Sequence, residues 1–139
     1  MRRSISCLLA ACLLVSLTWT CYSMDDAEQM QEDARRRAEQ LVMAVLKRDH
    51  GAIFDNCRYE GFSSSKGYKV DKFLERYYMD HYVCSKIEVI NVEVFPPDRA
   101  EVTVRAHLSV SPHHDMPPER IDVWELILKD KKWLLLLHR

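Results

Sequence analysis

Glycine is scarce in this chain, which has only three glycines and five prolines among its 139 residues. Such a composition leaves little room for flexible linkers or low-complexity segments, so we expect one folded domain. The sequence also lacks a glycine-rich phosphate loop, a nucleophile-elbow pattern, and both the CxxC and HExxH pairs. These absences argue against the common phosphate-binding, serine hydrolase and zinc classes, and we predict neither a cofactor nor a metal site.

An excess of charge of one sign is lacking as well. The chain has 20 basic and 21 acidic residues, which gives a formal net charge of -1. Proteins that bind nucleic acid generally carry a basic excess or a basic stripe, so we expect no nucleic acid partner. With 47% hydrophobic and 29% charged residues, the composition is that of an ordinary globular protein.

The first 23 residues differ in character from the rest. Arg2 and Arg3 precede an apolar stretch over residues 5–19, and no acidic residue occurs before Asp25. A basic start, an apolar middle and a small-residue end are the features of a secretory signal peptide. We therefore expect an exported protein of the periplasm or the extracellular space, with a single mature domain over residues 24–139.

Two alternatives to a cleaved signal peptide remain open. The segment can be retained as an N-terminal membrane anchor, although it is shorter than the roughly 20 apolar residues of a typical span. The tetrapeptide LAAC, which ends at Cys12, resembles the lipobox of bacterial lipoproteins, and Cys21 is a second position for a lipid. We expect membrane association only if the leader is retained or lipidated.

Three of the five cysteines lie in the leader, which leaves Cys57 and Cys84 in the mature domain. In an exported domain such a pair can form a disulfide, here closing a loop of about 28 residues and contributing about 3 kcal/mol. The alternative is two separate buried thiols that pack as small hydrophobic side chains. We predict the Cys57–Cys84 disulfide.

Helical periodicity dominates the first half of the mature domain. Apolar residues recur at three- and four-residue spacing from Ala27 to Leu46, and Gly51 is a typical helix terminator. Asp71 is expected to cap a later helix. The predicted segments are a long helix of about 25 residues after Ser23, a short helix over 52–57, a loop over 58–69 and a helix over 71–84.

After Cys84 the hydrophobic period changes from near 3.6 to two. Ile90, Val92 and Val94 are expected to share one face of the first strand. The run Leu134–Leu137 is too short for a membrane span and predicts a strand that is buried on both faces. The predicted strands are 86–95, 100–110, 120–128 and 133–139, with a hairpin turn over 129–132.

Helices followed by strands predict an α+β fold in which N-terminal helices pack on a curved antiparallel sheet. The stretch VLKRDHGAIFDNC resembles the opening, and WELILKDKKWLLLL the closing hairpin, of the nuclear transport factor 2-like superfold. This superfold is a cone of the cystatin-like class, and exported cystatin-like domains of other families share its layout. The resemblance, over about residues 25–139, implies a pocket between the concave sheet face and the helices. Such a pocket is catalytic, binds a ligand, or is filled with side chains.

The candidate site residues gather around Tyr77 and the sequence DHYVC. Tyr77 and His81 share a face of the expected helix, and histidine titrates near neutral pH as a general base must. The resemblance implies that His81 or Asp80 would be the base of an enzyme, with Tyr77 as donor. The alternative is that Tyr77 belongs to the core. The candidate ligand-pocket residues are Tyr77, Tyr78, His81, His107 and Trp124.

Small exported members of the superfold are often binding or assembly proteins. The resemblance therefore implies a non-enzymatic cell-envelope protein whose partner is a small apolar ligand, an envelope protein, or a second copy bound through the sheet. One alternative is a pocket enzyme of the isomerase, dehydratase or hydrolase type. Another is a membrane-anchored assembly component that resembles the periplasmic domains of type IV secretion systems, which requires an uncleaved leader.

Overall fold

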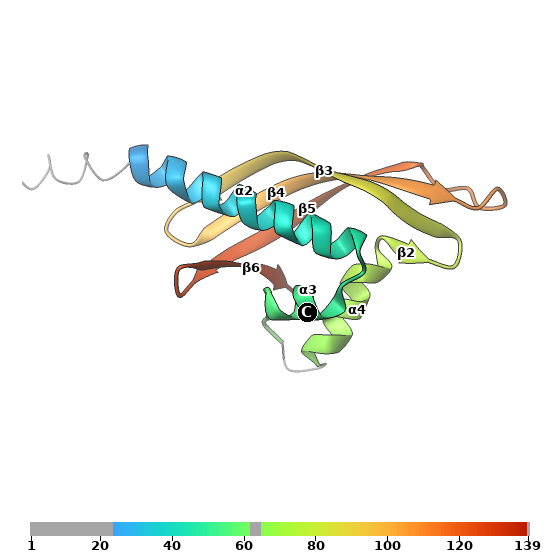
Figure 1. The fold of residues 1–139 in the computed structure, drawn as a ribbon, viewed down its shortest axis with the longest axis horizontal. Helices are drawn as coiled ribbons and strands as arrows, with labels where there is room; N and C mark the ends of the chain where they lie inside the picture. Colours follow the sequence, from blue (N-terminus) through green and yellow to red (C-terminus); the bar gives the residue numbers. More distant parts are fainter. Residues whose placement is uncertain (1–23, 62–64, 139) are drawn as a thin grey trace, which may run out of the picture.

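The computed structural model describes residues 24–61 and 65–138. The predicted leader, its cleavage and its lipidation therefore lie outside the described residues. Within those two ranges, no helix has the length and apolar character that a membrane span requires. In this described part of the chain, three helices and six strands form an α+β structure in which the helices precede most of the sheet (Figure 1), as the sequence predicts.

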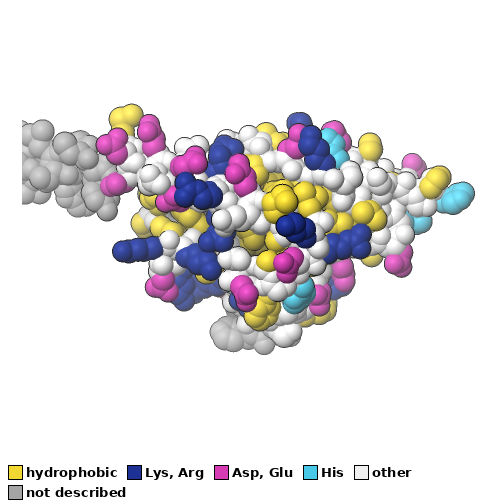
Figure 2. Space-filling model, in the orientation of Figure 1, with side chains coloured by type: hydrophobic (Ala, Val, Ile, Leu, Met, Phe, Trp, Pro, Cys, Tyr) yellow, Lys and Arg dark blue, Asp and Glu magenta, His cyan; other side chains and the backbone are white. Residues whose placement is uncertain are grey.

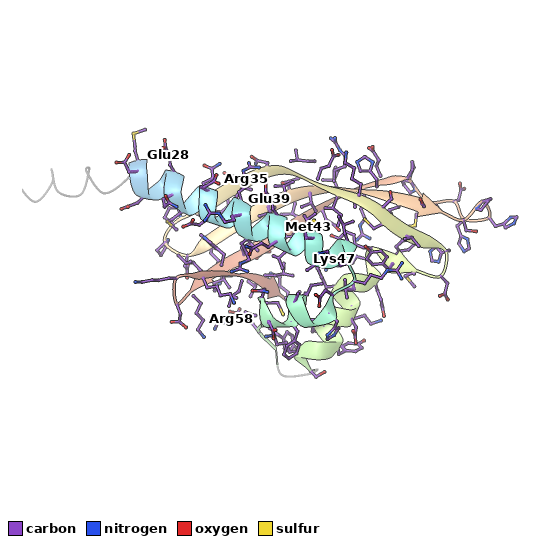
Figure 3. The ribbon with its side chains drawn as sticks, viewed as in Figure 1. Glu28, Arg35, Glu39, Met43, Lys47 and Arg58 are labelled. Carbon is purple, nitrogen blue, oxygen red and sulfur yellow. The ribbon has the colours of Figure 1, made fainter. Side chains whose placement is uncertain are left out.

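Helix α2 (Met24–Leu46) lies across one face of the sheet (Figure 1). Charged side chains of both signs are interspersed on the surface on that side (Figure 2), and Glu28, Arg35 and Glu39 project away from the sheet (Figure 3). The opposite stripe of α2 is apolar and largely made of small residues, which lets the helix pack closely on the strands. Its buried residues are Ala34, Ala38, Leu41, Val42, Ala44 and Val45.

The long helix was predicted correctly, but it ends before Gly51. Arg48 has φ 52°, a left-handed conformation that stops the helix. The Asp49 carboxylate then accepts a hydrogen bond from the Ala52 N–H at 3.0 Å and caps the short helix α3 (His50–Asp55). Gly51 therefore lies inside α3 rather than at the end of α2.

The helix predicted over residues 71–84 is wrong in both its start and its end. Helix α4 spans Lys66–Glu75, because the Ser65 hydroxyl caps its first turn by accepting from the Tyr68 N–H at 3.2 Å. After Glu75 the chain turns into the short strand β2 (Tyr78–Met79). Aromatic and β-branched residues favour strands, and here they pair with one another instead of continuing the helix.

The six strands form one sheet in the order β1-β6-β5-β4-β3-β2. Neighbouring strands are antiparallel except for β1, which is parallel to β6, so the sheet is mixed rather than purely antiparallel as predicted. The leucine run lies in β6, inside the sheet between β1 and β5, as its sequence predicts. The strand bounds are β1 Cys57–Tyr59, β2 Tyr78–Met79, β3 Tyr82–Phe95, β4 Arg99–Val110, β5 Glu119–Lys129 and β6 Lys132–Leu137.

Strand β3 is bent by two irregularities in its pairing with β4. The register shifts between Cys84 and Lys86 and again between Val89 and Asn91. Each shift moves the following side chains to the other face and bends the strand. As a result Ile90 is exposed although Val92 is buried, so the prediction that both lie on one face is wrong. The bends also contribute to the curl of the sheet beneath α2.

The predicted Cys57–Cys84 disulfide is not formed. Cys57 lies in β1 and Cys84 in β3, with three strands between them in the sheet, and both are free, buried thiols. Each thiol contacts a nearby carbonyl, that of Phe54 at 3.5 Å and that of Lys86 at 3.4 Å, respectively. Burial raises the pKa of both thiols, so they stay protonated and unreactive.

We therefore expect reducing agent to leave the Tm of the protein unchanged. Cys57 and Cys84 should react with a thiol reagent only after denaturation, because both side chains are buried. Thermal unfolding with and without dithiothreitol, combined with thiol titration in native and denaturing buffer, measures both effects. The disulfide would be shown to form if the Tm falls on reduction and if thiol titration of the denatured mature chain detects neither Cys57 nor Cys84.

Candidate functional site

Tyr77 and Trp124 lie together inside the protein, with Asp122 beside them. The Tyr77 hydroxyl donates to the Asp122 carboxylate at 2.6 Å and accepts from the Trp124 indole N–H at 2.8 Å. Tyr77 is 0% exposed and Trp124 is 1% exposed, and the ring of Phe73 packs edge-on against both. The cluster is held in the core because its polar groups are bonded to one another.

Two elements bring this cluster together. Tyr77 directly follows α4, whereas Arg120, Asp122 and Trp124 are alternate residues of β5 and therefore share its inner face. The Arg120 Nε lies 3.2 Å from the Asp122 carboxylate, and the same guanidinium donates to the Arg76 carbonyl at 3.1 Å. The cluster thus ties the end of α4 to the sheet.

Electrostatics keep Tyr77 protonated. Burial, and then the Asp122 carboxylate, raise the pKa of Tyr77 above the range in which phenols ordinarily titrate. Tyr77 therefore remains a neutral donor to Asp122 at all physiological pH values. Chemically, the arrangement is a closed set of hydrogen bonds in which a carboxylate is held by a phenol and a guanidinium.

Asp80 and His81 lie elsewhere, in the turn between β2 and β3. Asp80 is exposed, and the His81 ring stacks on His114 with centroids 4.3 Å apart and an interplanar angle of 14°. The premise that Tyr77 and His81 share a helix face is wrong, because no helix passes through residue 81. Any catalytic role of Asp80 or His81 stays a prediction that the geometry does not favour.

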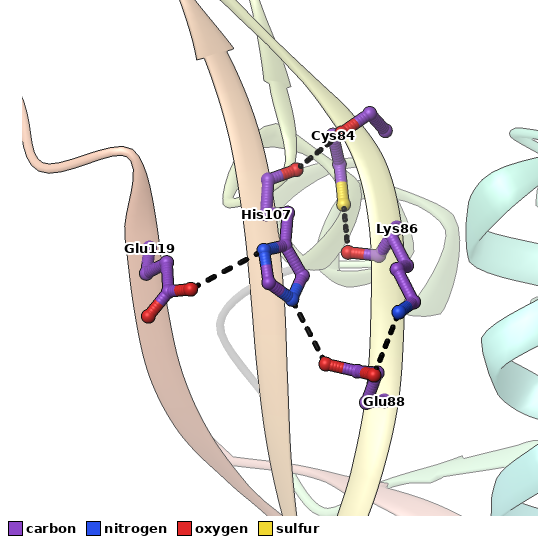
Figure 4. A network of polar contacts seen from close by, with 6 residues as sticks. Cys84, Lys86, Glu88, His107 and Glu119 are labelled. Carbon is purple, nitrogen blue, oxygen red and sulfur yellow. Dashed lines mark hydrogen bonds and ion pairs between the residues drawn. The ribbon is translucent and has the colours of Figure 1, made fainter.

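The register of β4 with β5 places His107 on the outer face of the sheet, opposite Trp124. Figure 4 shows His107 beside Glu88 and Glu119. The Nε2 of His107 is 2.9 Å from Glu88 and its Nδ1 is 3.4 Å from Glu119, while Lys86 reaches Glu88 at 2.7 Å. The two carboxylates approach opposite ring nitrogens, so they cannot share one metal ion with His107. Among residues 24–61 and 65–138, no three potential ligands form a metal-binding group.

Replacing Glu88 by glutamine should weaken the acid sensitivity of the fold. Lys86, and then His107, lower the pKa of Glu88 from 4.5 to about 2. A depressed carboxylate pKa stabilises the folded state above the unfolded pKa, and this contribution is lost as pH falls from about 4.5 to 2. Tm measured across that range should therefore fall less steeply for Glu88→Gln than for the wild type. Glu39→Gln, on the outer side of α2, is the control, and equal slopes for all three proteins would contradict this role.

Tyr78 is the remaining predicted pocket residue. The Arg48 guanidinium lies over its ring, 4.1 Å from the centroid, at the end of α2. Burial raises the pKa of Tyr78, and Arg48 opposes that shift. Of the five predicted ligand-pocket residues, the structure therefore brings only Tyr77 and Trp124 into direct contact.

The sequence analysis missed Asp122 and Arg120. A signal was available in the sequence, because Trp124 and Leu126 are alternate apolar residues of the predicted strand 120–128, as expected for its inner face. Extending the same alternation towards the N-terminus places Asp122 and Arg120 on that face as well. A carboxylate and a guanidinium at inward positions of a strand indicate a buried polar network.

A hollow of about 230 Å³ lies next to Trp124, between α4 and the strands β5 and β6. Phe73 and the end of the leucine run, Leu135–Leu137, supply apolar lining. Basic side chains of α4 and its C-cap line it as well, namely Lys69, Lys72 and Arg76. Of the predicted pocket residues, Trp124 alone contributes to this hollow.

The shape of the whole domain matches known structures. A domain of unknown function with a cystatin-like fold from Nostoc punctiforme superposes with a TM-score of 0.52 at 11% sequence identity, covering 84% of this chain and 77% of that chain. The chain has the cystatin-like fold of the nuclear transport factor 2-like superfold. The superfold predicted from the opening and closing stretches of the sequence is thereby confirmed.

Other solved structures superpose with lower TM-scores. One, from Shewanella oneidensis, is a protein of unknown function with a TM-score of 0.47, 13% identity, and coverage of 77% of this chain and 95% of its own. Another, an epoxide hydrolase from M. tuberculosis, has a TM-score of 0.49, 13% identity, and coverage of 78% and 82%. No family model and no curated protein matches the chain. These likenesses concern the fold alone, so function has to be argued from the residues.

Proposed function

We propose that this nuclear transport factor 2-like protein is exported to the cell envelope and acts there without catalysis, by binding a ligand or a protein partner. One observation carries the proposal. Tyr77 and Trp124 occupy the region between α4 and the inner face of the sheet, where a pocket enzyme of this fold would hold its substrate. Their polar groups bond to each other and to Asp122, so neither Tyr77 nor Trp124 offers a free donor or base there.

The positions of Asp80 and His81 support the same proposal. A general base has to reach a substrate atom within hydrogen-bond distance, in a site that restricts water. Asp80 is exposed in a turn, and His81 is engaged with His114 and the neighbouring ring of Tyr82. Neither side chain lies with Tyr77, so the three do not form an acid–base set.

The export part of the proposal rests on the sequence of residues 1–23. The test is the intact mass of the protein recovered from the cells that make it. A chain that begins at Met24 supports a cleaved signal peptide, and added lipid on Cys12 or Cys21 supports a lipoprotein. A full-length chain retained in the membrane would instead favour the membrane-anchored assembly component.

Native followed by denaturing mass spectrometry of the same sample tests the binding part. Mass that is lost on denaturation identifies a bound ligand, and a higher oligomer identifies either a protein partner or a second copy bound through the sheet. His81→Ala and Asp80→Asn should leave the bound species unchanged. Catalytic turnover that these substitutions abolish would overturn the non-enzymatic proposal.

A pocket enzyme of the isomerase, dehydratase or hydrolase type is the second candidate. The observation that favours it is the Asp122 side chain, which keeps 13% exposure between a phenol and a guanidinium. In this alternative Asp122, and not Asp80, would be the base. Asp122→Asn would then remove turnover of a substrate while the protein stays folded, whereas the favoured proposal expects only a loss of stability.

A further inference from the structure

We propose that the hollow beside Trp124 binds a small organic anion that consists of an apolar body and a carboxylate. This inference names the chemical class of ligand for the binding function proposed above and rests on it. Three features of the hollow carry the argument: its position at a fork in the sheet, its apolar lining, and two basic side chains on its rim that lack an acidic partner.

The hollow exists because β5 and β6 separate. Their pairing ends at Leu126 and Leu135, and beyond that point Leu136 and Leu137 pair with β1 instead. The part of β5 before Leu126 is paired only with β4, so a wedge opens between the two strands and α4 lies across it. The volume of about 230 Å³ exceeds the roughly 150 Å³ of an engineered cavity that accommodates benzene.

The lining beside α4 is apolar and well fixed. Phe73, Trp124, Leu135 and Leu137 are all buried, and the rings of Phe73 and Trp124 meet edge-on with centroids 5.6 Å apart. These side chains form a fixed floor, and Val123, which also lines the hollow and is 53% exposed, offers accessible apolar surface to an aliphatic or aromatic body. A strongly hydrated ligand such as inorganic phosphate would leave this surface unused.

The rim of the hollow is positively charged. Lys69 and Lys72 of α4 and its C-cap residue, Arg76, are three and four residues apart, so they project from one side of the helix. Lys72 is paired with Glu75 at 2.7 Å. No ion pair among the described residues involves Lys69 or Arg76, which instead lie 5.7 Å and 5.8 Å from the centroids of aromatic rings.

The chain has enough acidic residues to pair with Lys69 and Arg76. It contains 21 acidic and 20 basic residues, so the lack of ion pairs at these two positions in the described part of the chain does not reflect a shortage of carboxylates. The one carboxylate that lines the hollow belongs to Glu125, and it is bound to His138 at 2.9 Å. The free charge at the rim is therefore positive, which favours an anionic ligand.

The peptide groups of β6 near the fork are engaged by both neighbouring strands. The Leu135 N–H donates to the Asn56 carbonyl and the Leu137 carbonyl accepts from the Glu60 N–H, so both residues direct their peptide groups towards β1. Successive residues of a strand direct these groups to opposite edges, so those of Leu136 face β5, where the pairing of Leu126 with Leu135 joins the Leu136 N–H to the Glu125 carbonyl. Recognition of a carboxylate at the hollow therefore rests on the charges of Lys69 and Arg76.

The test is a titration of the full-sequence protein, as recovered from the cell, with sodium octanoate, followed by backbone amide chemical shifts. We expect saturable shifts at Val123, Glu125 and Leu136. Acetate, which lacks the apolar body, and 1-octanol, which lacks the charge, should both bind more weakly. The double variant Lys69→Gln/Arg76→Gln should bind octanoate about tenfold more weakly, as expected for the loss of two partly exposed ion pairs.

The matched control is Arg36→Gln/Lys47→Gln, which removes the same charge from α2 and the residue that follows it, and should leave octanoate affinity unchanged. The inference is overturned if octanoate gives no saturable shift at the fork, if 1-octanol binds as tightly, or if both double variants behave alike. These outcomes concern the hollow alone. The non-enzymatic proposal is judged separately by the bound species seen in native mass spectrometry and by turnover of the Asp80, His81 and Asp122 variants.

Discussion

Replacing Trp124 by alanine is expected to lower the free energy of unfolding by about 3 to 5 kcal/mol. The indole is 1% exposed, packs edge-on against Phe73 and Tyr77, and donates its N–H to the Tyr77 hydroxyl. The substitution removes this contact area, leaves a cavity and takes a partner from a buried hydroxyl. Because domains are typically stable by only about 5 to 15 kcal/mol, a large part of the margin would be lost. Urea denaturation measures the difference.

Val123→Ala is the control for this substitution. Val123 is the preceding residue of β5, points to the other face and is 53% exposed. Its replacement should change the free energy of unfolding by no more than about 0.5 kcal/mol. If Trp124→Ala costs less than about 1 kcal/mol, the region beside the inner sheet face is not tightly filled, and the main observation behind the proposed function fails.

Replacing Tyr77 by phenylalanine should lower the free energy of unfolding by about 2 to 3 kcal/mol, although only one oxygen atom is removed. The Asp122 carboxylate would lose its 2.6 Å hydrogen bond, and the Trp124 N–H would lose its acceptor. Arg120 would still hold Asp122, which limits the loss. For a domain of this size the expected decrease in Tm is roughly 10 °C.

Tyr68→Phe provides the matched control, because Tyr68 is in α4 and is 50% exposed. The same chemical change there should leave Tm within about 2 °C of the wild type. The double variant Tyr77→Phe/Asp122→Asn should recover part of the loss, since no charge is then left without its phenol partner. Equal stability of the wild type and Tyr77→Phe would show that the Tyr77 hydroxyl is solvated.

Strong local periodicity made several elements predictable. The apolar stripe of α2, the strict alternation of β4 and the leucine run of β6 each contain enough residues to fix the element and its buried face. The boundaries of α4 were not predictable in this way. Ser65 and Asp71 are both good N-caps, and the choice depends on tertiary packing, which buries Val70 and Phe73 in the core.

Other features depend on spatial neighbours that local sequence does not identify. The parallel pairing of β1 with β6 separates Cys57 from Cys84, and the sequence does not encode this pairing visibly. The bulges of β3 change which of its residues point into the core, and no glycine in the strand indicates where these bulges occur. For the same reason Tyr77 was recognised as a candidate while its partner Asp122, 45 residues later, was not.

The most direct test of the account is the hydrogen exchange rate of the Trp124 indole N–H, measured by nuclear magnetic resonance in the folded protein. The account places this group in a hydrogen bond to Tyr77, on a side chain that is only 1% exposed. It therefore predicts exchange only through global unfolding, with protection close to that of the most stable amides of β4. Exchange of the indole N–H within minutes, while those amides stay protected, would show an interior open to water and would contradict the account.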